Sequence, residues 1–132
     1  MSEGVWTMPK VTTGIGNDFT FTRQSAAFGT AGILIIGNKA GRIYRAHVCN
    51  TAAATAYYLQ IHDKATAPVN ADIPSLSYRV NASSDLVIDF TNVNGAPFFN
   101  GLGVALSTTA GVLTLAAAND ISWMKLVYTR NA

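Results

Sequence analysis

Charge is scarce in this chain. Lysine, arginine, aspartate and glutamate together make up 12% of its 132 residues, against about 25% in an average soluble domain. The 9 basic and 7 acidic residues nearly cancel, and Arg42 and Arg45 form the one close basic pair beside a predicted strand. A nucleic-acid surface needs a basic stripe, so we expect no nucleic-acid partner. The surface must be largely neutral, and charge repulsion then does little to prevent association with other protein subunits.

Cysteine and long apolar runs are also lacking. Cys49 is the single cysteine, so no internal disulfide can form and stability must come from a packed core and from partners. No stretch approaches the roughly 18 apolar residues of a membrane span, and the first residues lack the basic segment and apolar run of a secretory signal. We therefore expect a chain made in soluble form, with no membrane partner.

The residues that could carry chemistry are few and scattered. His47 and Cys49 share one face of a predicted strand, where such a pair could activate a thiolate or hold part of a metal site, but the sequence indicates no third group to orient them. Asp85 and Asp89 lie roughly 13 Å apart along a strand, too far for a glycosidase pair. The glycines of residues 14–17 are too few for a phosphate-binding turn. We therefore expect no catalytic residue, cofactor or metal site, and a protein that is not an enzyme.

Alternation of apolar and polar residues with period two dominates the chain after residue 30. The runs are short and bounded by Gly, Asn, Asp and Pro, and none has helical periodicity. This pattern predicts an all-β, antiparallel β-sandwich, with a jelly roll as the preferred topology. Residues 31–132 form the sandwich and residues 1–30 an extended N-terminal arm with one short strand. Strands are expected at 19–22, 32–36, 42–50, 57–61, 76–80, 86–90, 102–106, 112–116 and 122–129.

Several segments in order resemble a family of small phage virion proteins, the head-decoration (cement) and head-fibre proteins. They are the strand end Val48-Cys49-Asn50-Thr51-Ala52-Ala53, the run from Tyr57 to Pro68, a second loop proline at Pro74, the strand 86–90 and the segment 99–105. The resemblance covers about residues 42–128. It implies a homotrimer that is made in the host cytoplasm and binds the outer surface of the virion capsid. There the protein would contact the major capsid protein and stabilise the head by bridging capsid subunits.

Contact residues follow from this interpretation. The arm carries four apolar side chains that could anchor on the capsid: Trp6, Met8, Phe19 and Phe21. Phe19 and Phe21 are at least as well suited to the core. Three residues are candidates for the interface between subunits: Tyr58, His62 and Trp123. In the alternative function, a head- or tail-fibre module that recognises host surface glycans, the same three would stack on and hydrogen-bond the sugar. A histidine near a three-fold axis, His47 or His62, would make assembly depend on pH.

Overall fold

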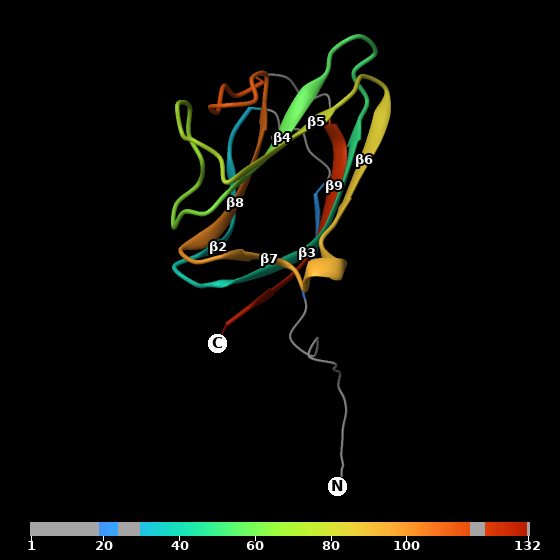
Figure 1. The fold of residues 1–132 in the computed structure, drawn as a ribbon. Helices are drawn as coiled ribbons and strands as arrows, with labels where there is room; N and C mark the ends of the chain where they lie inside the picture. Colours follow the sequence, from blue (N-terminus) through green and yellow to red (C-terminus); the bar gives the residue numbers. More distant parts are fainter. Residues whose placement is uncertain (1–18, 24–29, 117–120, 132) are drawn as a thin grey trace, which may run out of the picture.

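The computed structural model describes residues 19–23, 30–116 and 121–131 (Figure 1), and side-chain packing within 30–116 and 124–131. Over these ranges the chain forms nine strands and one 3-10 helix, without an α-helix. The strands are β1 (Phe19–Arg23), β2 (Ile33–Gly37), β3 (Gly41–Asn50), β4 (Tyr57–His62), β5 (Leu76–Val80), β6 (Ser84–Asp89), β7 (Ala96–Phe98), β8 (Gly101–Ser107) and β9 (Ile121–Arg130), and the 3-10 helix η1 is Thr91–Val93. The described part holds no helix long and apolar enough to cross a membrane.

The strands form two antiparallel sheets, as the sequence predicts. The first sheet has the order β1-β9-β3-β6, with β7 paired to the start of β3, and the second sheet has the order β2-β8-β4-β5. The two sheets lie face to face in Figure 1, with their apolar faces toward each other. This is the architecture of an all-β sandwich.

The core lies between the sheets and consists of the alternate residues of each strand. Val48 of β3 and Leu126 of β9 reach it from the first sheet, and Leu59 of β4 and Leu106 of β8 reach it from the second. All four are fully buried. Since burying such a side chain contributes roughly 1.5–3 kcal/mol, the period-two pattern accounts both for the strands and for their pairing into two layers.

Asn50 explains why β3 ends where the sequence has a conspicuous Asn followed by small residues. Its buried side-chain amide donates to the carbonyl oxygens of Thr55, Val80 and Asn81, and its Oδ1 accepts the N–H of Ala52. One side chain thus satisfies backbone groups of the loop after β3 and of the turn between β5 and β6. A buried amide with this many partners fixes two loops against each other.

Two expectations about strands need correction. The strand expected at 112–116 is wrong: only Leu115 makes a β-bridge, to Ser107, and the rest of the segment is a loop. Conversely, the short strand β7 was not expected, because Pro97 removes one of its few N–H donors. The proposed arm, apart from β1, lies outside the described residues.

Gly41 permits the close approach of three strands, which gives a test of the register. Its Cα partners are Phe98 of β7 and Arg130 of β9, and an added Cβ would lie 2.1 Å from the carbonyl oxygen of Thr129. Gly41→Ala is therefore expected to lower the free energy of unfolding by about 2 kcal/mol or more, measured by urea denaturation. At the control position, Gly111, a Cβ meets nothing within 4 Å. Gly111→Ala should therefore change the free energy of unfolding by less than about 0.5 kcal/mol. Equal stability of the two variants would contradict the register.

Candidate functional site

Strand β4 is buried on both of its faces. Leu59 and Ile61 point into the core, and yet the alternate residues Gln60 and His62 are also only 0% and 1% exposed. Over β4 and β8, the outer face of the second sheet is covered by two loops, residues 63–75 and 108–116, which we call the loop cap. Figure 1 shows these loops on the side of the molecule formed by β2, β8 and β4.

The amide of Gln60 holds the second of these loops. Its Nε2 donates to the carbonyl oxygens of Thr109, Ala110 and Val112 at 2.9, 3.3 and 3.2 Å. Ser107 adds a further hydrogen bond from its hydroxyl to the carbonyl of Thr109 at 2.7 Å. Loop carbonyls that would otherwise be buried without donors are satisfied in this way, which is the condition for folding a loop onto a sheet.

His62 lies beside this amide and is held as a neutral ring. Its Nε2 is 3.1 Å from Oε1 of Gln60. Because Nε2 of Gln60 faces carbonyls, its Oε1 is the acceptor, and the imidazole proton is assigned to Nε2 of His62 by this network. Burial lowers the pKa of His62, opposed by the negative charge of Asp72 and reinforced by the positive charge of Lys64.

The two loops of the cap are also joined to each other. Ala71 N–H donates to the carbonyl of Leu113, and Leu113 N–H donates to that of Asp72, each at 2.8 Å. Lys64 forms an ion pair with Asp72, and its hydrogen bond, followed by that from Val69 N–H, lowers the pKa of the Asp72 carboxyl. The cap is therefore one hydrogen-bonded unit rather than two separate loops.

The small residues of β8 make room for this unit. The sequence indicates that the Gly101, Gly103 and Ala105 face of β8 can be approached closely by other backbone, and the loop cap occupies that space. A Cβ on Gly103 would lie 2.8 Å from the ring of Pro68. The close approach is thus made by the chain's own loop.

The outer surface of the cap is neutral and partly apolar. Val69, Ile73 and Val112 are 56%, 78% and 44% exposed. The cap contains three charged residues, and all are engaged: Lys64 pairs with Asp72, and Asp63 accepts the N–H groups of Phe99 and Asn100. Its other exposed residues are Thr, Ala, Asn, Ser and Gly. A protein partner could bind here with little charge to desolvate.

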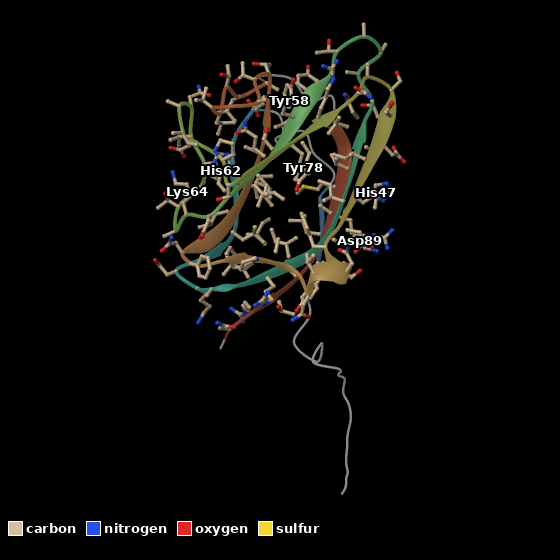
Figure 2. All side chains as sticks on the ribbon, viewed as in Figure 1. His47, Tyr58, His62, Lys64, Tyr78 and Asp89 are labelled. Atoms are coloured by element: carbon tan, nitrogen blue, oxygen red, sulfur yellow. The ribbon has the colours of Figure 1, made fainter. Side chains whose placement is uncertain are left out.

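Charge collects on the opposite side of the sandwich, on the outer face of the first sheet. Arg45 and Lys125 are exposed there, with Asp85 and Asp89 on the neighbouring strand. Figure 2 shows His47 and Asp89 on this side and His62 and Lys64 on the side of the cap. The two outer faces therefore differ in chemistry, one neutral and one charged.

The pair formed by His47 and Cys49 has a third group that sequence reasoning missed. Asp85, the Cα partner of Cys49, has a carboxylate oxygen 3.4 Å from Nε2 of His47. A hydrogen bond from Cys49, followed by one from His47, lowers the pKa of Asp85. The Cys49 thiol thus donates a hydrogen bond to the Asp85 carboxylate. Among the described residues no group of three or more His, Cys, Asp or Glu is placed to hold a metal ion.

The predicted contact residues have different outcomes. Trp6 and Met8 lie outside the described residues. Phe19 and Phe21 belong to β1, where their Cα partners are Tyr128 and Leu126. Trp123 of β9 is the Cα partner of Cys49. For these three residues the structure describes the backbone and not the side chain. Tyr58 is partly exposed, opposite Arg79 and Ser107. His62 lies inside its own protomer, so only Tyr58 of the described candidates offers surface to a neighbour.

Comparison with known proteins found no matching family model, no matching curated protein and no matching solved structure. The functional argument therefore depends on the geometry of this chain and on the sequence resemblance of residues 42–128.

The buried His62 makes stability depend on pH. Its pKa in the fold lies below the 6.5 of a free imidazole, so below about pH 6.5 the unfolded chain takes up a proton that the folded chain does not, and the free energy of unfolding decreases. We expect this decrease between about pH 7 and about pH 5 in urea denaturation. The depressed carboxyl pKa values of Asp72, Asp85 and Asp89 act at lower pH, since they start from 3.8.

The matched variants are His62→Gln and His47→Gln. Glutamine can still donate to Oε1 of Gln60 but does not titrate. His62→Gln should therefore make the free energy of unfolding nearly independent of pH between about pH 7 and about pH 5. His47→Gln, at a half-buried site on the other face, should leave most of the slope. A slope that survives in His62→Gln would show that another group is responsible.

Proposed function

We propose that this protein is a bacteriophage capsid decoration (cement) protein that binds the major capsid protein on the outer surface of the head and acts as a homotrimer. The observation that carries the proposal is the loop cap, a rigid surface with exposed Val69, Ile73 and Val112 and with its three charges engaged internally. Exposed apolar residues among neutral polar groups are typical of the centre of a protein interface, from which charged residues are depleted. The resemblance of residues 42–128 to decoration proteins supplies the partner.

The connectivity supports a jelly-roll topology, which is common in viral capsid proteins. Of the eight strands other than β7, β1, β3, β6 and β9 belong to the first sheet and β2, β4, β5 and β8 to the second. Along these eight strands the chain therefore crosses between the sheets at each step except from β4 to β5, which pair with each other. Eight strands in the orders β1-β9-β3-β6 and β2-β8-β4-β5 fit two Greek keys, with β7 as an added strand. Fold alone does not establish function, so this observation is secondary to the cap.

The energetics of cementing suit a neutral surface. A protein that binds the assembled shell and not its unfolded subunits stabilises the shell by mass action. Symmetry repeats the contact at every equivalent site, and an oligomer that contacts several capsid subunits raises the effective concentration of each further contact. A modest interface without buried charge is therefore sufficient.

The alternative, a fibre module that recognises host glycans through Tyr58, His62 and Trp123, receives less support at that place. His62 is enclosed beneath the cap and hydrogen-bonded to Gln60. Its ring therefore presents no edge to a sugar.

Binding to shells tests the proposal directly. Purified protein is mixed with phage shells that lack it and the shells are pelleted, and its mass is measured by light scattering. We expect three times the 13.9 kDa protomer mass and pelleting at a fixed ratio to capsid subunits. Val69→Glu places a charge on the cap and should weaken binding about 10-fold or more.

Val93→Glu is the matched control. Val93 is 63% exposed, close to the 56% of Val69, but lies in η1 and not in the cap. This variant should bind within about two-fold of the parent, as expected for a substitution outside the interface. Equal binding by both variants would exclude the cap as the docking surface, and failure of the unaltered protein to pellet with any shell would overturn the proposed function.

A further inference from the structure

A groove of about 390 Å³ lies at one end of the first sheet, across β7, the start of β3 and the end of β9. These strands lie in the lower part of Figure 1. The lining of the groove includes Arg42, Tyr44, Pro97, Phe99, Thr129 and Asn131. None of these residues belongs to the loop cap. The volume is within the range of about 300–1,000 Å³ of small-molecule sites.

Arg42 is fixed in this groove by the backbone around it. Its Nη1 donates to the carbonyls of Asn94 and Gly95 at 3.2 and 3.4 Å. Gly95 has φ +87°, and a Cβ there would lie 3.0 Å from both Cβ of Arg42 and Cε1 of Tyr44. A guanidinium has five N–H donors in a rigid fork, so an Arg anchored at one nitrogen keeps donors of fixed direction for a ligand.

Phe99 supplies an exposed aromatic surface beside this cation. Its side chain is 70% exposed, while its backbone N–H donates to both carboxylate oxygens of Asp63 at 2.9 and 3.0 Å. The backbone is thus held although the ring is free to contact a ligand. Tyr44 lines the same groove, so the groove holds two aromatic side chains that a ligand could pack on.

Arg42 is the one charged side chain among the described residues that line the groove, while the Asp63 carboxylate is hydrogen-bonded to the backbone N–H of the lining residue Phe99. No described residue that lines the groove is acidic. Thr129 and Asn131 add a hydroxyl and an amide. This set matches a ligand with an apolar face, several hydroxyl groups and one carboxylate.

We propose that this groove binds a carboxylate-bearing sugar, a uronic-acid unit of a polysaccharide. The C–H face of the pyranose ring packs on Phe99, the carboxylate is bound by Arg42, and the ring hydroxyls hydrogen-bond Thr129 and Asn131. The assignment does not depend on decoration, because the cap and the groove share no lining residue. It places sugar recognition on different residues from those predicted from the sequence.

The experiment titrates the full chain with hexagalacturonate and with galactohexaose, which lacks the carboxylates, by isothermal calorimetry at low and at physiological salt. We expect saturable binding of hexagalacturonate and at least 10-fold weaker binding of the neutral hexasaccharide. Arg42→Gln should weaken the acidic ligand about 10-fold or more, as expected for loss of a hydrogen-bonded charge pair. Phe99→Ala should weaken the binding of both hexasaccharides.

Arg79→Gln is the control for charge. Arg79 is an exposed arginine of β5, outside the groove, with its Nε bonded to Asn81, and its removal should leave binding unchanged. Phe99 is exposed, so Phe99→Ala tests the site even if Arg42→Gln perturbs the turn at Asn94. Absence of saturable binding, equal binding by Arg42→Gln and Arg79→Gln, or hexaglutamate binding as tightly as hexagalacturonate would each overturn the proposal.

Discussion

The position of the loop cap on the second sheet depends on the hydrogen bonds made by the Gln60 side chain. A sheet face covered by loops must satisfy the loop carbonyls that it buries, and Gln60 does so for Thr109, Ala110 and Val112. The same side chain orders His62 through its Oε1. Ser107, the Ser107–Leu115 bridge and the buried Leu113 hold the same loop, but Gln60 is the side chain of β4 that bonds its carbonyls.

Buried amides serve this chain where other small domains use disulfides or ion pairs. Asn50 joins the loop after β3 to the turn between β5 and β6, as Gln60 joins the cap to β4. Both side chains are neutral, so their burial costs less than burial of a charge and their hydrogen-bonding capacity is high. A chain with 12% charged residues and one cysteine can thus fix long loops and keep a neutral outer surface at the same time.

Much of the fold could be predicted from the sequence, because each strand has one apolar face and period-two alternation is a local signal. The burial of Gln60 and His62 could not, since a polar residue on the outward face of a strand reads as solvent-exposed until the covering loop is placed. The glycines of β8 were the available signal, as they indicated a close approach without naming the approaching segment. The strand expected at 112–116 failed for the same reason: its apolar residues serve the cap, where Leu113 is buried, and not a sheet edge.

The neutrality of the cap has a consequence for specificity. A surface with its charges engaged internally gains little from long-range steering, so discrimination between partners must come from shape and from the apolar contacts of Val69, Ile73 and Val112. Such recognition requires a rigid surface, because a flexible loop would lose conformational entropy on binding. The cross-loop hydrogen bonds between Ala71, Asp72 and Leu113 supply that rigidity before any partner arrives. In the function proposed for this chain, internal satisfaction of polar groups and preorganisation for docking are therefore one structural feature.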